Sequence, residues 1–335
     1  MPLLEVEGLK TQFTTRHGVV HAVDGVDLSL DAGETLAIVG ESGCGKSATA
    51  LSIMGLLPAP RGRVAAGSIR FDGRELVGLE GRALDRLRGP EIAMVFQDPL
   101  TSLNPSFTVG AQIVETLRRH LPLDKAAARK RAVELLGETR ISSPERRLDA
   151  YPHQLSGGMR QRVMIALALA CNPRLLIADE PTTALDVTVQ ADILGLLASL
   201  RDEHGMGMIL ITHDMGVAAE TADRVAVMYA GQVVEQAPVE ALFARPEHPY
   251  TEALLGALPP LDGDDVRHAR LTAIPGRPPD LIDPPAACRF RDRCPHAAAD
   301  DGCATAAPPL RELRPGHWVR SAHPASARQG TVVGA

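Results

Sequence analysis

Long hydrophobic runs and an excess of positive charge are both missing from this sequence. The longest apolar run, residues 163–171, falls far short of the ~20 residues that cross a bilayer. The chain carries 35 Lys and Arg against 41 Asp and Glu, a formal net charge of −6. Broad nucleic-acid binding needs a basic surface, so we expect no nucleic-acid partner. The N-terminus also lacks the charged and then apolar segments of a secretory signal. We therefore predict a cytoplasmic chain that reaches a membrane only through partners.

Cysteine is scarce as well. The five cysteines are an odd number, which argues against a disulfide framework in a chain expected to stay in a reducing compartment. Three of them, Cys288, Cys294 and Cys303, crowd into a stretch of 16 residues. In a reducing compartment such a group first indicates a metal or cluster site.

Strand-like and helix-like segments alternate through the first two thirds of the chain. Short apolar runs at residues 35–39, 175–178 and 208–211 are typical of strands buried in a parallel sheet. A turn and a helical pattern follow each run, so we predict an α/β fold with a parallel-sheet core. Residues 1–33 instead alternate about a turn at His17-Gly18 and predict a small antiparallel sheet.

Three later segments depart from that alternation. Residues 109–136 carry apolar residues at helical spacing and predict a helical insertion. Residues 224–236 predict a hairpin that turns at Ala230-Gly231. Fifteen of the 26 prolines lie between residues 231 and 335, so we expect the last third to be rich in turns.

Residues 40–47 match a phosphate-binding loop. Their sequence, GESGCGKS, fits the pattern G-x-x-x-x-G-K-[ST] between an expected strand and an expected helix. Glycines let successive backbone N–H groups point at phosphate oxygens, and the helix start adds its positive dipole end. Lys46 would contact the β- and γ-phosphates and Ser47 would bind Mg²⁺. The alternative is a glycine-rich turn that binds nothing. The loop consists of Gly40, Glu41, Ser42, Gly43, Cys44, Gly45, Lys46 and Ser47.

Cys44 of this loop lies next to Gly45-Lys46 at the start of the expected helix. An electropositive helix start favours the thiolate form, so we expect a reactive thiol that bound nucleotide protects from alkylation. The alternative is a small side chain that merely fills the place of a serine.

Two acidic residues end the apolar run in RLLIADE, residues 174–180. Ligands of open α/β sheets bind at the carboxyl ends of the strands, which brings Asp179 beside the phosphate loop, where it would hold Mg²⁺ through water. Glu180 suits a general base that polarises the attacking water. The alternative is an acidic turn at a strand end with no chemical role.

Residues 155–162, LSGGMRQR, closely resemble the signature of ABC-type ATPases. Further motifs of that family occur before and after the signature, in the family's order. They are Gln97 after an apolar strand at 92–96, Asp186 in TTALD, and His213 after MILIT. The resemblance extends from about residue 3 to 240. It implies an ABC-type P-loop ATPase domain at 1–235, with a parallel-sheet core, a small antiparallel β-subdomain and a helical subdomain at about 100–160.

The resemblance also implies ATP and Mg²⁺ as ligands. In the family two domains pair head to tail, and each ATP lies between one phosphate loop and the partner domain's counterpart of Ser156, Gly157 and Gly158. Gln97 would sense Mg²⁺ and the attacking water, and Asp186 would bridge the two domains. His213 would hold the γ-phosphate and orient Glu180, although a lone histidine is more often a core residue. The implied catalytic residues are Lys46, Gln97, Glu180 and His213, and the implied Mg²⁺ ligands are Ser47, Gln97 and Asp179.

The family stacks adenine on an aromatic residue that precedes the phosphate loop. Phe13 is the only aromatic residue before residue 40, so we nominate it for that role. The alternative is a core residue of the small sheet.

Several stretches resemble the ATP-binding subunits of dipeptide and oligopeptide importers. They are GESGCGKS, FQDPLTSLNPSFTVG, EHPYTEALL at 247–255, and the Pro- and Cys-rich extension at 236–335. The resemblance implies a peripheral ATPase at the cytoplasmic face of the membrane that powers peptide import. Its partners would be a second ATPase subunit, two permease subunits and an extracytoplasmic peptide-binding protein. The alternatives are an importer of nickel or another solute and, less fittingly, a soluble non-transport ABC ATPase.

The importer subunits of that family carry a fourth cysteine near the position of Ser321. Cys288, Cys294 and Cys303 are therefore expected to hold a [4Fe–4S] cluster or a Zn²⁺ ion, with His323 as the leading candidate for the fourth ligand. His317, Ser321 and water are the other candidates, and the alternative is a loop with three free thiols.

Overall fold

Two β-sheets form the centre of the protein in a computed structural model that describes all residues except 80, 184, 259–272, 298–301 and 330–335. The smaller sheet has the strand order β2-β1-β4-β5. Its strands are β1 (Leu4–Thr15), β2 (Gly18–Leu30), β4 (Gly62–Phe71) and β5 (Arg74–Glu75). All of its pairings are antiparallel, and Thr15 pairs with Gly18 across the first turn. The predicted N-terminal antiparallel sheet is confirmed, and its turn lies at Arg16-His17, one residue before the predicted His17-Gly18, because Gly18 already pairs with Thr15.

The larger sheet has the strand order β11-β12-β10-β9-β3-β8-β7-β6. Its parallel strands are β3 (Thr35–Val39), β6 (Ile92–Val95), β7 (Leu175–Asp179), β8 (Gly207–Thr212) and β9 (Arg224–Tyr229). Every residue of β3, β7 and β8 is buried. Strands covered on both faces need continuous apolar runs, which is why the predicted parallel core is recognisable in the sequence.

Three antiparallel strands complete the larger sheet. They are β10 (Gln232–Pro238), β11 (Arg311–Arg314) and β12 (His317–Val319). The hairpin predicted at Ala230-Gly231 is present between β9 and β10. The expected boundary between residues 235 and 236 falls inside β10, because that strand runs on to Pro238 and pairs with β12 of the extension.

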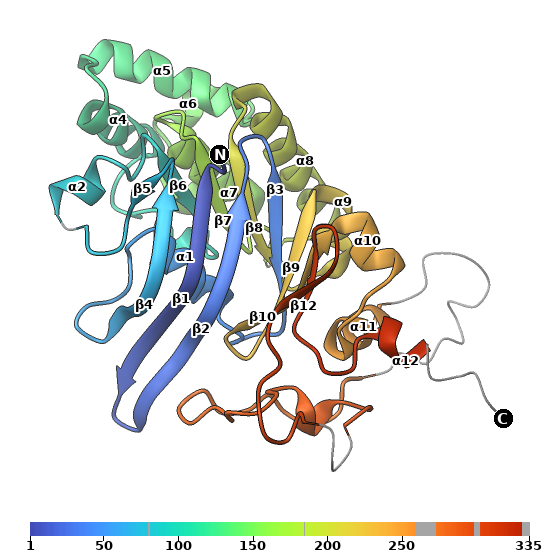
Figure 1. The fold of residues 1–335 in the computed structure, drawn as a ribbon. Helices are drawn as coiled ribbons and strands as arrows, with labels where there is room; N and C mark the ends of the chain where they lie inside the picture. The colour runs from blue at the N-terminus through green and yellow to red at the C-terminus, as the bar shows by residue number, and fades with distance from the viewer. Residues whose placement is uncertain (80, 184, 259–272, 298–301, 330–335) are drawn as a thin grey trace, which may run out of the picture.

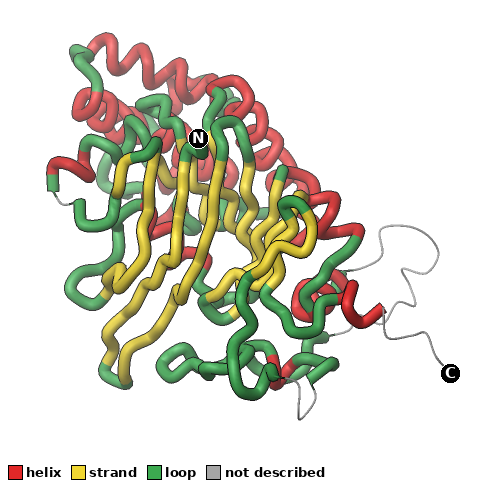
Figure 2. Tube along the Cα trace, in the orientation of Figure 1, coloured by secondary structure: helices red, strands yellow, loops and turns green. Residues whose placement is uncertain are grey.

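Helices cover the sheets, as Figure 2 shows. The α-helices are α1 (Lys46–Ile53), α2 (Arg82–Asp85), α3 (Pro99–Ser102), α4 (Val109–His120), α5 (Lys125–Glu138), α6 (Pro144–Arg147), α7 (Gly157–Leu169), α8 (Val187–His204), α9 (Met215–Thr221), α10 (Val239–Ala244), α11 (Pro249–Gly256) and α12 (Ala325–Gln329). Two 3₁₀ turns are η1 (Pro152–Gln154) and η3 (Arg291–Arg293). Among the described helices, none is both long enough and apolar enough to cross a membrane.

The predicted helical insertion consists of α4 to α6. Helices α4 and α5 pack against α7 through a separate apolar cluster, and α6 contacts α5. The side chains of Thr108 and Asp124 cap the first N–H groups of α4 and α5. In Figure 1 this insertion and the orange and red extension lie at opposite ends of the molecule. Parts of the predicted extension, at 259–272, 298–301 and 330–335, lie outside the described residues.

Candidate active site

The phosphate loop joins β3 to α1 and passes close to neighbouring backbone. A Cβ atom at Gly40 would lie 2.1 Å from the Met228 carbonyl oxygen, and one at Gly45 would lie 2.3 Å from that of Ala22. Gly45 also has a φ of 109°, a conformation that side chains other than glycine rarely adopt. The loop therefore needs glycine at both positions in order to pass between β2 and β9.

Lys46 is buried and bends back over its own loop. Its Nζ donates to the carbonyl oxygens of Gly40, at 2.7 Å, and Glu41, at 3.2 Å. These contacts hold a positive charge at the loop, where a phosphate would lie. A pocket opens at this point, and its lining includes residues from four chain segments: Ala22, Ser42, Gly43, Gly45, Lys46, Ser47, Ala48, Gln97 and Glu180.

Asp179 fits the expected role of a Mg²⁺ ligand. It is 5% exposed, and burial raises the pKa of its carboxyl, against the lowering effects of the Ser47 hydrogen bond and the Lys46 charge. Its buried Oδ1 atom has no hydrogen-bond partner among the described residues. A buried oxygen of this kind, next to a serine hydroxyl, suits a hard cation that prefers oxygen ligands.

Glu180 is the meeting point of three side chains. Its Oε2 atom accepts hydrogen bonds from Gln97 Nε2, at 2.9 Å, and from Thr183 Oγ1, also at 2.9 Å. His213 Nδ1 lies 3.5 Å from the same oxygen. Glu180 has a φ of 45°, which is unfavourable for glutamate and turns its side chain away from the course of β7.

The structure thus brings together Gln97, Glu180 and His213, which the sequence separates widely. Thr183 was missed by the sequence analysis. A threonine three residues after a candidate base, in the turn that leaves β7, was the available signal. Three groups on one carboxylate oxygen orient that carboxylate towards the pocket lined by Lys46 and Ser47.

The signature and Asp186 lie outside this pocket. Ser156 caps α7 by accepting from the Met159 N–H, and Asp186 caps α8 by accepting from the Val189 N–H. Both residues are exposed. Ser156, Gly157, Gly158 and Asp186 do not belong to the described lining of the phosphate pocket. One chain therefore leaves the signature open on its own surface.

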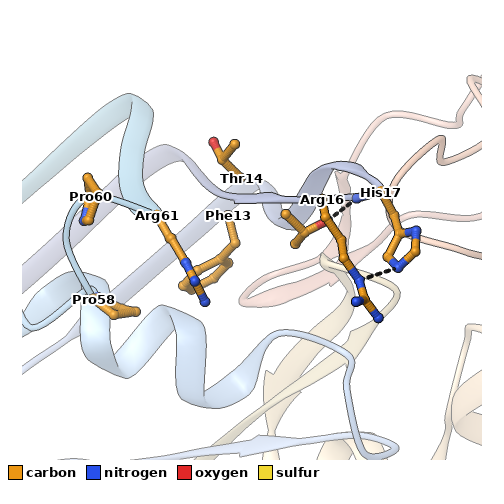
Figure 3. Close-up of a pocket in the computed structure, with 8 residues that line it drawn as sticks. Phe13, Thr14, Arg16, His17, Pro58, Pro60 and Arg61 are labelled. Carbon is orange, nitrogen blue, oxygen red and sulfur yellow. Dashed lines mark hydrogen bonds between the residues drawn. The ribbon is translucent and has the colours of Figure 1, made fainter.

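Phe13 lies in a different surface pocket, on β1. The lining residues are Phe13, Thr14, Thr15, Arg16, His17, Pro58, Pro60 and Arg61. In Figure 3 the Phe13 ring and the Arg61 side chain point to the same side of the strand. Phe13 is only partly buried and is not a member of the core cluster beneath the small sheet. The alternative of a core phenylalanine is therefore wrong.

Cys44 corrects one expectation. Its side chain is 4% exposed, and burial raises the pKa of its thiol even though Lys46 lies nearby. The nearby lysine favours the thiolate, but the removal of water disfavours it more strongly here. The expected reactive thiolate is wrong, and the small-filler interpretation fits the packing.

We therefore expect Cys44 to react slowly with an alkylating agent at neutral pH in the folded protein. Its modification should be at least about tenfold slower than in the urea-unfolded chain, because the thiol is both buried and largely protonated. Mass spectrometry of peptides after timed alkylation measures this rate, and Cys44→Ser identifies the peptide. Equal rates in folded and unfolded protein would contradict the burial argument.

The tail cysteines do not form the expected metal site. The described residues contain no group of three or more His, Cys, Asp or Glu side chains placed to hold a metal ion, so Cys288, Cys294, Cys303 and His323 do not fit a cluster or a zinc ion. Cys288 and Cys294 instead pack on an apolar cluster that contains Tyr229, Tyr250 and Phe290. Phe290, which is 2% exposed, anchors this segment in the core.

Known proteins resemble the chain over nearly its whole length. A family model described as ABC transporter matches residues 23–183, and one described as Oligopeptide/dipeptide transporter, C-terminal region matches residues 234–303. A probable peptide ABC transporter ATP-binding protein of Sinorhizobium fredii is 53% identical over 315 residues, which cover 94% of this chain and 93% of that protein. The oligopeptide transport ATP-binding protein OppD of Bacillus subtilis is 52% identical over 319 residues, which cover 95% and 88%.

Solved structures agree with that likeness. A dimeric ATP-binding cassette in a post-hydrolysis state, bound to ADP and Pi, has a TM-score of 0.64 and 30% identity, covering 70% of this chain and 98% of that one. CbiO1 of Clostridium perfringens, part of an ABC transporter complex, has a TM-score of 0.61 and 31% identity, covering 72% and 91%. The predicted cassette fold is thereby confirmed. Since the identity exceeds one half over almost the full length of this chain and its relative, the protein belongs to the ABC-type ATPases that serve as ATP-binding proteins of ABC transporters.

Proposed function

We propose that this chain hydrolyses ATP to power the import of dipeptides or oligopeptides through a membrane ABC transporter. One observation carries the hydrolytic part: the Glu180 carboxylate is held by Gln97, Thr183 and His213 at a pocket that Lys46 and Ser47 also line. The peptide part is supported by the family model that matches residues 234–303 and by the printed names of the relatives.

In this proposal each side chain acts on a defined atom. Glu180 accepts a proton from the attacking water, while His213 and Thr183 keep its carboxylate oriented. Lys46 places its charge on the β- and γ-phosphates of ATP. Asp179, Ser47 and Gln97 would hold Mg²⁺, which would supply positive charge to the phosphate oxygens.

Two copies of the cassette, or this chain and a related one, would close head to tail over ATP. The N–H groups at the start of α7, which Ser156, Gly157 and Gly158 leave accessible, would meet the partner's γ-phosphate. Asp186, exposed at the start of α8, would lie at the contact between the cassettes. Phe13 would stack on adenine, which its partly buried ring on β1 allows. Closure on ATP and opening after hydrolysis would move the transporter.

The proposed assembly contains two such ATPases, two permease subunits and an extracytoplasmic peptide-binding protein, with this chain peripheral at the cytoplasmic face. We propose residues 1–235 as the ATPase domain and 236–335 as the extension. That division is supported by family models that match 23–183 and 234–303. Import of nickel or another solute is the second candidate, because the peptide assignment is supported by the family model and the relatives' names and not by a contact within this chain. ATP turnover by the reconstituted transporter, with binding protein and either dipeptides or Ni²⁺, separates the two.

Lys46→Ala tests the phosphate site itself. We expect ATP affinity to fall about 10- to 100-fold, because a charge-assisted contact with the phosphates is lost. Lys130→Ala, which removes an exposed lysine of α5, serves as the matched control and should bind ATP normally. Titration with a fluorescent ATP analogue gives both constants. Unchanged affinity in Lys46→Ala would remove residues 40–47 from the nucleotide site.

A further inference from the structure

The C-terminal extension holds the phosphate loop through a buried ion pair. Arg293, in the 3₁₀ turn η3, donates from Nη1 to Glu41 Oε2 at 2.8 Å and from Nη2 to Glu41 Oε1 at 2.9 Å. The Arg293 side chain is 5% exposed and that of Glu41 is 27% exposed. Two parallel hydrogen bonds between a guanidinium and a carboxylate fix both groups in one orientation. A residue 252 positions away therefore sets the direction of the loop's second residue.

The backbone of Glu41 is held as well. Its N–H donates to the hydroxyl oxygen of Tyr250, on α11, at 3.0 Å. Arg293 also contacts Tyr229, by a 3.3 Å hydrogen bond to the hydroxyl and with its guanidinium 5.6 Å from the ring centre. The Tyr229 and Tyr250 rings lie 4.6 Å apart, and Phe290 packs against both, 5.2 Å from Tyr229 and 5.4 Å from Tyr250. The arginine that pairs with Glu41 is thus itself held in place by aromatic side chains.

The same segment reaches the far side of the loop. Arg289 is paired with Asp24 of β2 and donates to the Ala230 carbonyl oxygen. The next residue, Gly231, donates its N–H to the carbonyl oxygen of Cys44 at 2.8 Å. One short segment therefore supports the phosphate loop at two points. Arg293 contacts Glu41 directly, and Arg289 contacts Ala230, whose neighbour Gly231 donates to Cys44.

We propose that Arg289 and Arg293 position the phosphate loop for ATP, with Arg293 as a positioning residue that acts through Glu41, so that the state of the C-terminal extension sets the affinity for ATP. The inference rests on the proposed assignment of residues 40–47 as the phosphate site. A loop whose N–H groups already point inward binds phosphate without a further ordering cost. Glu180, Gln97 and His213 do not contact Arg293 in the described hydrogen bonds and ion pairs, so the chemical step should survive its loss.

Arg293→Met is the direct test, in the full chain assembled with its transporter partners. We expect the KM for ATP to rise about tenfold, with kcat within about twofold of wild type. Arg293→Lys keeps the charge but not the paired geometry and should restore part of the affinity. The matched control is Arg291→Met, which removes the same charge two residues away. Arg291 is 34% exposed and contacts Asp292 at 3.8 Å, so its loss should leave both constants unchanged.

Glu41→Gln weakens the Arg293–Glu41 ion pair from the side of the phosphate loop, and it tests the proposal even if Arg293→Met fails to fold. It keeps the size of the side chain and weakens the ion pair, so its KM should rise in the same way. Because coupling between two sites is reciprocal, MgATP should slow amide hydrogen exchange at residues 288–294 in the wild type, and less in Glu41→Gln.

Two results would overturn the proposal. One is a KM for ATP in folded Arg293→Met within twofold of wild type. The other is a variant that loses activity only in proportion to its loss of folded protein, with no change in KM. The proposed function fails differently: normal ATP affinity in Lys46→Ala would reject the assignment of residues 40–47, on which the inference rests, whereas an unchanged KM in Arg293→Met rejects the inference alone.

Discussion

Glu180→Gln should leave ATP binding intact and slow hydrolysis by about 10²–10⁴-fold. The amide keeps the size of the side chain and can still pair with Thr183 or Gln97, but it cannot take a proton from water. The contacts of Gln97, Thr183 and His213 all converge on one carboxylate oxygen, so substitution there removes the base while leaving the lining of the phosphate pocket in place. Phosphate release under saturating MgATP, set against nucleotide binding by the same protein, measures the split.

Glu220→Gln is the matched control, because Glu220 is exposed at the end of α9 and the same charge is removed away from the pocket. It should hydrolyse ATP at the wild-type rate. A Glu180→Gln protein that turns over ATP at near the wild-type rate would show that another group activates the water. The Glu180 variant should also accumulate as an ATP-bound dimer with its partner, which size-exclusion chromatography with MgATP detects.

Ser156→Arg should lower hydrolysis by about 10²-fold or more without weakening ATP binding to the isolated chain. Ser156 is exposed and caps α7 outside the described lining of its own phosphate pocket. A bulky charged side chain there would block a partner's nucleotide and leave the chain's own nucleotide untouched. Binding to the monomer and hydrolysis by the assembled pair therefore have to be measured on the same preparation.

Ser142→Arg introduces the same side chain at another exposed position of the helical insertion and should hydrolyse ATP normally. If Ser156→Arg lost monomer affinity in proportion to its hydrolysis, the signature would act on its own nucleotide and the head-to-tail arrangement would be wrong.

Local patterns were enough to predict the core of the fold. The β3, β7 and β8 runs were recognisable because strands covered on both faces must be apolar throughout. The phosphate loop was recognisable because close backbone approach and a helix start demand glycines, Lys46 and Ser47 at set intervals. Glu180 was recognisable at the end of the β7 run, but Gln97 and His213 were identified only through a family resemblance, since nothing local brings their chain segments to Glu180.

Tertiary packing decided the rest. The sequence alone, through its apolar runs, glycines and motif spacings, determined a parallel-sheet ATPase core with its phosphate loop, because each of those features depends on neighbours a few residues away. It could not determine that burial raises the pKa of the Cys44 thiol, that β12 extends the sheet of the ATPase domain, or that Arg293 pairs with Glu41. Those outcomes depend on the removal of water and on contacts between residues up to 252 positions apart, which exist only once the whole chain has folded.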